Sequence, residues 1–160
     1  MEIKIRPIAP GDNPSLARII RDSLSEFGAN KPGTVYYDPT TDHLYELFRE
    51  PRSGYFVAEQ DGQLLGGAGI FPTAGLPADT CELVKMYLVP AARGKGLGRM
   101  LVDHSMEQAR SAGFSQVYLE TMPELKQALA MYARLGFEYI DQPMGNSGHT
   151  GCSLWMLRTL

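Results

Sequence analysis

Residues 90–99 read Pro-Ala-Ala-Arg-Gly-Lys-Gly-Leu-Gly-Arg, and they join an apolar, strand-like stretch to an amphipathic helical one. The glycines of this loop are Gly94, Gly96 and Gly98, and its cations are Arg93, Lys95 and Arg99. Alternate glycines let successive backbone N–H groups converge on one anion, and the positive end of the following helix dipole adds to the attraction. The segment therefore predicts a pyrophosphate-binding loop within a mixed α/β chain.

Two common nucleotide-binding patterns do not fit this loop. A Walker loop ends in Gly-Lys followed by Ser or Thr, and the dinucleotide pattern needs a further glycine, whereas Gly98 is followed by Arg99. A methyltransferase-type Gly-x-Gly-x-Gly loop fits the letters, with Glu120 as a ribose partner. Such loops normally open the sheet, however, and this one follows several strands.

The rest of the chain alternates between strand and helix patterns. Period-two or apolar runs predict strands at 3–5, 55–59, 64–71, 80–89, 114–120, 137–140 and 152–157. Helical spacing predicts helices at 12–28, at 40–48, from Gly98 to Gly113 and from Pro123 to Gly136. Asp61-Gly62 predicts a hairpin, the mixed faces of 80–89 predict a bulged central strand, and the aperiodic residues 29–39 predict a lid.

Composition limits the classes of function. The chain has 160 residues, of which 44% are hydrophobic and 21% are charged, which suits one globular domain over 1–160. A net charge of −3 provides no basic field, so neither nucleic acid nor membrane is an expected partner. Without a membrane-length apolar run or a signal-like N-terminus, the protein is expected to be cytoplasmic. We expect Cys81 and Cys152 to be reduced.

Two motifs together resemble one family. Pro90-x-x-Arg93-Gly94-x-Gly96-x-Gly98 is followed some thirty residues later by Leu129-x-x-Tyr132-x-x-Leu135-Gly136-Phe137. Both motifs, and the order of the elements from Ile3 to Leu157, are similar to those of the GNAT superfamily of acetyl-CoA-dependent N-acetyltransferases. The resemblance implies an α/β (α+β) fold: a mixed, mostly antiparallel sheet flanked by about four helices, with a splayed V between the fourth and fifth strands.

The resemblance also implies how acetyl-CoA binds. In this family the cofactor lies in the V, and its pantetheine amides pair with strand backbone, here that of residues 86–89. Those residues are Met86, Tyr87, Leu88 and Val89, and the pyrophosphate is expected on the loop residues Gly94, Lys95, Gly96, Leu97, Gly98 and Arg99. The family often has an Asn after the fifth strand to contact the pantetheine arm. Thr121 follows that strand here, which puts this contact in doubt.

Catalytic roles are implied in the same way. The backbone N–H of Leu88 would polarise the thioester carbonyl, and Tyr132 would protonate the departing thiolate. Glu82 occupies a strand position where many GNAT enzymes carry the carboxylate that deprotonates the amine, directly or through water. A solvent-facing or ion-paired strand glutamate is an equally good interpretation of Glu82 from the sequence.

Other candidates come from the loops. Tyr36, Tyr37 and Asp38 are candidate acceptor-binding residues, although aromatic residues between helices commonly cover a core. The histidines have no metal-ligand spacing, so no metal is expected, and His149 lies in a glycine-rich loop that could border the acceptor pocket.

The sequence thus predicts transfer of acetyl from acetyl-CoA to a primary amine of a small molecule, by direct attack in a ternary complex. A non-catalytic CoA or acyl-CoA sensor and a protein N-acetyltransferase are the alternatives. A sensor would need neither Tyr132 nor Glu82. The acceptor amine is not identified by the sequence, which also leaves open whether the chain forms a homodimer.

Overall fold

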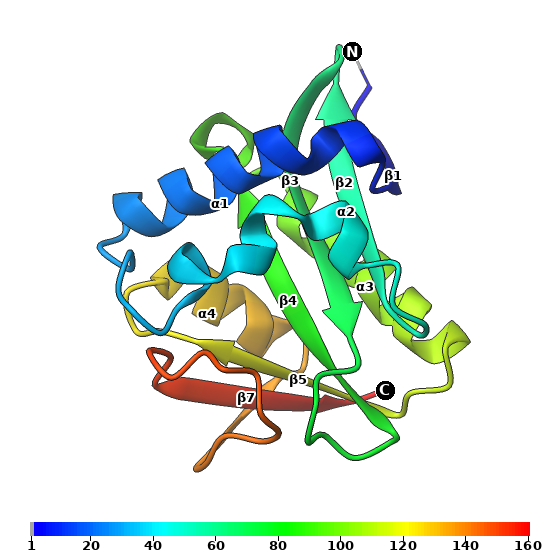
Figure 1. Cartoon of the computed structure of the whole chain (residues 1–160), viewed down its shortest axis with the longest axis vertical. Helices are drawn as coiled ribbons and strands as arrows, with labels where there is room; N and C mark the ends of the chain where they lie inside the picture. The colour runs from blue at the N-terminus through cyan, green and yellow to red at the C-terminus, as the bar shows by residue number, and fades with distance from the viewer. Residues whose placement is uncertain (1) are drawn as a thin grey trace.

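The computed structural model describes residues 2–160. Its strands are β1 (Lys4–Pro7), β2 (Gly54–Gln60), β3 (Gln63–Phe71), β4 (Thr80–Leu88), β5 (Gln116–Thr121), β6 (Glu138–Ile140) and β7 (Leu154–Thr159). Its α-helices are α1 (Asn13–Glu26), α2 (Leu44–Leu47), α3 (Leu97–Ser111) and α4 (Lys126–Arg134). The order along the chain is the one that the sequence predicts (Figure 1).

All seven strands form one sheet in the order β1-β2-β3-β4-β5-β7-β6. Every neighbouring pair is antiparallel except β4 and β5, which run parallel. That parallel pairing covers only Thr80 to Glu82 on β4, opposite Gln116 to Tyr118 on β5. Beyond this point the two strands diverge, as Figure 1 shows from their meeting point at the lower right. The predicted fold class, including the splayed V, is confirmed.

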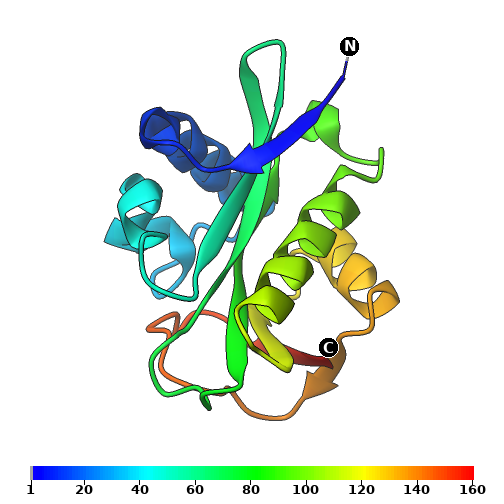
Figure 2. The ribbon, with the colours of Figure 1, turned by 90° about the vertical axis from the view of Figure 1, so that its right-hand side faces the viewer.

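Helices cover both faces of the sheet. Figure 2 shows α1 and α2 on one face and α3 and α4 on the other. The buried face of α3 is the predicted stripe, with Leu101, Val102, Ser105, Met106 and Ala109 all buried. The α1 face packs Leu16, Ile20 and Leu24 against Leu44 and Phe48 of the second helical segment. An apolar layer therefore packs on each face of the sheet, and the V between β4 and β5 opens between the two layers.

Two predicted irregularities of the backbone are present. At the tip of the β2–β3 hairpin, Asp61 and Gly62 both have left-handed φ angles, of 53° and 79°, as a type I′ turn requires. On β4 the register with β3 shifts between the pairs Gly69–Val84 and Gly67–Tyr87. Lys85 has a φ of 54° within this interval, so the expected bulge lies on β4 and redirects the strand where the V opens.

Several predicted boundaries are wrong by a few residues. The last helix begins at Lys126 and not at Pro123, because Leu125 has a non-helical ψ of 58°. The helix expected over 40–48 is divided at His43 into a 3₁₀ turn, Pro39–Asp42, and the single α-helical turn of α2. The last strand begins at Leu154, after a turn in which the Cys152 N–H donates to the His149 carbonyl.

The structure also bears on two expectations from composition. Cys81 and Cys152 are both free, as predicted, with Cys81 buried. Among residues 2–160, every helix is too short or too polar to cross a lipid bilayer.

Candidate active site

A cavity of about 690 Å³ occupies the V between β4 and β5. Its walls come from β4, the glycine loop, the end of β5, α4 and the loop before β7. The predicted site residues that line it are Glu82, Met86, Tyr87, Leu88, Arg93, Gly94, Gly96, Gly98, Arg99 and Tyr132. One cavity therefore joins the phosphate loop to both candidate catalytic side chains.

Three predicted cofactor residues do not line the cavity. The Val89 N–H donates to the Leu65 carbonyl at 2.8 Å, so it already has a partner in the sheet. The Leu97 side chain is only 2% exposed and belongs to the core. Lys95 is exposed on the loop. Leu97 and Lys95 are thus placed to contribute backbone N–H groups and charge to the rim, and not side-chain contacts inside the cavity.

The glycine loop has the backbone that an anion site needs. Gly94 and Gly96 have left-handed φ angles of 76° and 80°, and a Cβ on either would meet no atom within 4 Å. The N-cap residue of α3 is Gly96, which has no side chain to bond the N–H groups of the first helical turn, so these groups remain available to a ligand. A Cβ on Gly98 would lie 3.1 Å from Met131 Sδ, so this glycine permits the close approach of α4.

Arg93 has a structural role in addition to its place on the cavity wall. Its Nε and Nη2 donate to the Leu88 carbonyl at 3.2 and 3.0 Å. Its Nη1 lies 2.7 Å from Glu26 Oε2, and the guanidinium stacks over Phe27 at 5.0 Å. Arg93 therefore fastens the end of β4 to the end of α1. Arg99, with its side chain 72% exposed, makes one long ion pair with Asp103, at 3.9 Å on the surface of α3, and can reach phosphate at the cavity rim.

Tyr132 faces the cavity from α4. The residue is 7% exposed, and its ring packs against Phe137 with the centroids 5.8 Å apart. No described residue hydrogen-bonds its hydroxyl, which is unusual for a buried tyrosine. Burial raises the pKa of Tyr132, so the hydroxyl keeps its proton at every physiological pH. Tyr132 thus lines the cavity as a proton donor that has no hydrogen-bond partner among the described residues.

Glu82 is buried at the point where β4 leaves β5. The residue is 3% exposed, and its Oε1 accepts a hydrogen bond of 2.6 Å from the Thr73 hydroxyl. Burial, reinforced by the negative charge of Glu120, raises the pKa of Glu82 to about 7. The interpretation of Glu82 as a solvent-facing residue, which the sequence left open, is therefore wrong. A carboxyl with this pKa can accept a proton from an amine near neutral pH.

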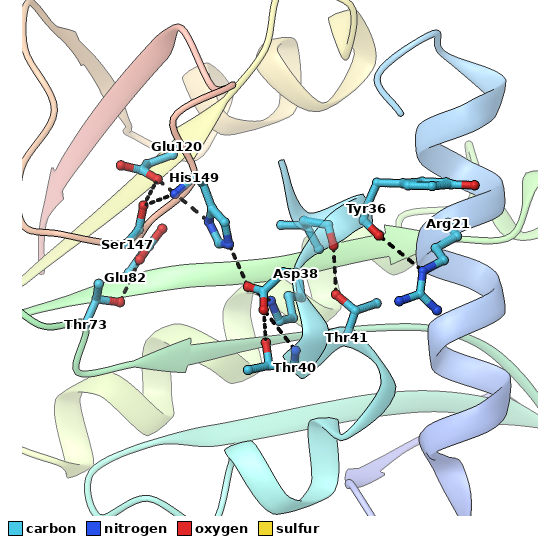
Figure 3. A network of polar contacts seen from close by, with 12 residues as sticks. Arg21, Tyr36, Asp38, Thr40, Thr41, Thr73, Glu82, Glu120, Ser147 and His149 are labelled. Carbon is cyan, nitrogen blue, oxygen red and sulfur yellow. Dashed lines mark hydrogen bonds and ion pairs between the residues drawn. The ribbon is translucent and has the colours of Figure 1, made fainter. Parts of the chain in front are cut away.

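Two further polar residues face Glu82, and sequence reasoning did not select them for this chemistry. Glu120, at the end of β5, accepts a 2.7 Å bond from the Tyr118 hydroxyl and a short one from Ser147. His149 lines the cavity from the loop before β7, and its Nδ1 is 3.8 Å from Glu120 Oε1 (Figure 3). The glycine-rich loop around His149 was the sequence signal that pointed here.

Of the three predicted acceptor residues, the structure places one near the candidate site and two away from it. Asp38 binds His149, with its Oδ2 2.8 Å from the imidazole Nε2, and it lies 3.7 Å from Lys85 Nζ. Tyr37 is 58% exposed, and neither Tyr37 nor Tyr36 lines the cavity. Figure 3 shows the Tyr36 ring pointing away from Glu120, toward α1, where Arg21 holds its carbonyl. Asp38 is thus brought to the site and the two tyrosines are not.

The 29–39 segment lies against the loop that carries His149. The Gly151 N–H donates to the Gly33 carbonyl at 2.7 Å, in addition to the Asp38–His149 contact. Val35 of this segment lines the cavity. The predicted lid therefore forms part of the cavity wall through Val35 and is hydrogen-bonded to the loop that carries His149.

One group of side chains could accept a cation. Glu82, Glu120 and His149 each offer one ligand atom, and these atoms lie within 4.8 Å of one another. The spacing of the histidines in the sequence gives no sign of such a group, because its members come from β4, β5 and a distant loop.

Comparison with known proteins identifies the fold and the family. The model of the acetyltransferase (GNAT) family matches residues 16–137 of this chain. The chain belongs to this family. An uncharacterized N-acetyltransferase of Escherichia coli K12, YjgM, is 48% identical over 158 residues, which cover 98% of this chain and 94% of the relative. This GNAT chain is therefore an acyltransferase enzyme, which sets aside the methyltransferase and the non-catalytic sensor.

Solved GNAT structures share the architecture. A GNAT-family acetyltransferase from Staphylococcus aureus Mu50 superimposes with a TM-score of 0.88 at 18% identity, covering 99% of each chain. The structure of yncA from Salmonella typhimurium, with acetyl-CoA as its cofactor, gives a TM-score of 0.76 at 21% identity and covers 100% of this chain and 95% of that one. At these identities the likeness shows the fold alone.

Proposed function

We propose that this enzyme transfers the acetyl group of acetyl-CoA to a primary amine of a small molecule. The observation that carries the proposal is the single cavity that joins the glycine loop, the Tyr132 hydroxyl and the Glu82 carboxyl. The GNAT relatives, and the acetyl-CoA bound by yncA, support the choice of donor. The walls formed by residues 29–39 and by the His149 loop favour a small acceptor over a protein tail.

The residues suggest a simple order of steps. Glu82 takes one proton from the acceptor ammonium, directly or through water, and the freed nitrogen lone pair attacks the thioester carbon. The N–C bond forms, the C–S bond breaks, and the electron pair leaves with sulfur. Tyr132 donates its proton to that sulfur, the amide nitrogen passes its second proton through water to the Tyr132 phenolate, and Glu82 releases its proton to solvent. A thiolate released into the same apolar cavity becomes a stronger base, which favours this transfer from a weakly acidic phenol.

Direct attack is favoured over an acyl-enzyme. One cysteine, Cys152, lines the cavity. Burial raises the pKa of the Cys152 thiol to about 12, so it is not a thiolate at neutral pH. Incubation with acetyl-CoA alone should therefore leave Cys152 without added acetyl mass, and double-reciprocal plots should intersect. A stable acetyl mass on Cys152, with parallel plots, would indicate a ping-pong reaction.

The activity itself is tested by free-thiol release. Acetyl-CoA should be consumed with amino acids, alkylamines, polyamines or aminoglycosides as acceptors, and the product should carry the acetyl group on nitrogen. Acetylation of a peptide panel, with no small amine turned over, would instead support a protein N-acetyltransferase.

Gly96→Val tests the cofactor site. Its side chain would obstruct the approach of the pyrophosphate to the loop N–H groups, each worth about 1.5 to 3 kcal/mol as a charge-assisted bond, so we expect at least a tenfold weaker CoA Kd. Gly62→Val is the matched control, because Gly62 has a φ of 79° and equally open surroundings on the hairpin. Calorimetry should find CoA binding unchanged in the control. Equal affinities in both variants would contradict the assignment of the loop.

A further inference from the structure

The acceptor end of the cavity brings three electron-pair donors face to face. They are a carboxylate oxygen of Glu82, one of Glu120 and Nδ1 of His149, all within 4.8 Å of one another. One carboxylate oxygen of Glu82 accepts a hydrogen bond from Thr73, and no described residue donates a hydrogen bond to the other oxygen. Three such atoms repel one another unless a cation or a set of N–H donors lies between them. Lys85 already places one positive charge near Glu82, and the three facing atoms favour a further cation or N–H donor between them.

Each donor is held in place from behind. The Tyr118 hydroxyl donates a hydrogen bond to the Glu120 carboxylate. Ser147 binds the same carboxylate, and Thr73 binds Glu82 (Figure 3). Asp38 is itself fixed by the Thr40 backbone N–H and hydroxyl, at 2.9 and 2.7 Å, and binds His149 Nε2. This group is preorganised in the way a binding site for a small ligand has to be.

Asp38 also decides which imidazole nitrogen faces the cavity. Burial alone would raise the pKa of Asp38, but the bond to His149, the nearby Lys85 charge and the Thr40 bonds hold it well below its usual range. An ionised Asp38 only accepts hydrogen bonds, so His149 Nε2 carries the proton toward it. In the neutral ring, Nδ1 then presents its lone pair to Glu82 and Glu120.

The charges around this group disfavour a carboxylate on the acceptor. Lys85 is the cation nearest to it on β4, and its side chain is 3% exposed and already paired with Asp38. Glu82 and Glu120 are left to face the acceptor, so a second negative charge brought beside them would be repelled.

We propose, on the basis of the acetyl transfer proposed above, that Glu82, Glu120 and His149 bind the acceptor ammonium group and select primary amines that carry no carboxylate beside the nitrogen. A primary ammonium has three N–H donors, which matches the three acceptors. Glu120 and His149 are specificity-determining residues in this arrangement. Amines of this kind are the products of amino-acid decarboxylation, so that class of reaction is one that would supply such an acceptor.

Matched acceptor pairs test the selectivity. Isobutylamine is compared with valine, phenethylamine with phenylalanine, and ethanolamine with serine, so that within each pair only the carboxylate differs. Since like charges in contact cost several kcal/mol, we expect kcat/KM for the better amines to exceed that of the paired amino acid by at least roughly tenfold. Equal or better turnover of the amino acids would overturn the proposal.

Variants connect the selectivity to the residues. Glu120→Gln keeps the size of the side chain and removes one charge, so KM for the amine should rise at least roughly tenfold and the preference over the amino acid should shrink. His149→Asn should likewise raise the amine KM. KM for acetyl-CoA should stay within about twofold in both, which a general loss of structure would not allow. Glu107→Gln, on the exposed face of α3, is the charge-matched control and should leave every constant unchanged.

Direct binding separates this proposal from the proposed function. If no amine is acetylated, calorimetry on the enzyme with bound CoA still reports whether isobutylamine or phenethylamine binds, and whether Glu120→Gln abolishes that binding. Binding that depends on Glu120 supports the ammonium subsite even where acetyl transfer fails. Absence of binding overturns the subsite. Zn²⁺ that binds with a submicromolar Kd, and whose removal by chelation abolishes turnover, would overturn it too, because the group would then be a metal site.

Discussion

Tyr132→Phe should lower kcat roughly tenfold to a thousandfold while leaving CoA affinity within a few-fold. The substitution removes one oxygen, and with it the proton that the departing thiolate needs. Because no described residue hydrogen-bonds this hydroxyl, no internal bond is lost, and the free energy of unfolding should change little. The measurements are a turnover rate, a CoA titration and a denaturant midpoint on the same preparation.

Tyr55→Phe is the matched control. Its hydroxyl is also buried, but it donates a 2.7 Å hydrogen bond to the Lys85 carbonyl. Removing it leaves a buried carbonyl unsatisfied and should cost about 1 to 3 kcal/mol of stability, with a much smaller effect on the rate per folded molecule. Tyr132→Phe with normal turnover and a lowered midpoint would show that Tyr132 is a structural residue and not the acid.

Glu82→Gln should lower kcat/KM by roughly a hundredfold or more near pH 7.5. The wild-type rate should rise through pH 7 as the carboxyl, whose pKa burial raises to about 7, becomes ionised, and then level off. The variant has no base and depends on the small fraction of neutral amine, which grows about tenfold per pH unit below an amine pKa near 10. The deficit should therefore shrink toward pH 9.5. A deficit that is constant from pH 7.5 to 9.5 would contradict the role of Glu82 as the base.

The same substitution should stabilise the fold at alkaline pH. Burial raises the pKa of Glu82 from 4.5 to about 7, so the folded protein binds this proton more tightly than the unfolded chain. Stability is therefore lost as pH rises from 4.5 to 7, and the full cost, roughly 3 kcal/mol at about 1.4 per pKa unit, persists above pH 7. Glu82→Gln should recover it at pH 8 and gain little at pH 4.5, as measured by urea denaturation. Lower stability of the variant at pH 8 would mean that Glu82 is not strained by burial.

The proposed cofactor half of the site could be inferred from the sequence because its residues are close together along the chain. The glycine loop follows β4 directly. Its backbone is left-handed at positions 94 and 96, and glycine, the residue that adopts this conformation most easily, stands at both positions. Likewise, Asp61-Gly62 determines its own turn. The bulge at Lys85 was expected on β4 from the mixed faces of the strand, although a lysine with a positive φ has no local sequence signal.

The proposed acceptor half could be inferred only in part, because its residues are far apart along the chain. The parallel pairing of β4 with β5 brings Glu120 near Glu82, and a loop fastened to residues 29–39 brings His149 there. The position of Arg93 under the Leu88 carbonyl likewise depends on α1, some 65 residues earlier, as the Ser23–Leu88 contact illustrates. Tertiary contacts of this kind produce no regular spacing of residues in the sequence. The sequence could therefore indicate only the two loops, residues 29–39 and the glycine-rich loop around His149.

The contact between residues 29–39 and the His149 loop has a consequence for how this enzyme could diversify. The predicted donor-binding backbone and glycine loop lie in one continuous stretch through β4 and the start of α3. The acceptor walls, in contrast, include two surface loops joined by a few bonds, and the family match at residues 16–137 ends before His149. Loops tolerate exchange far better than the elements that they connect. Recombining these two loops as a pair, so that their mutual bonds are inherited together, is therefore a route to new acceptors that leaves the acetyl donor site intact.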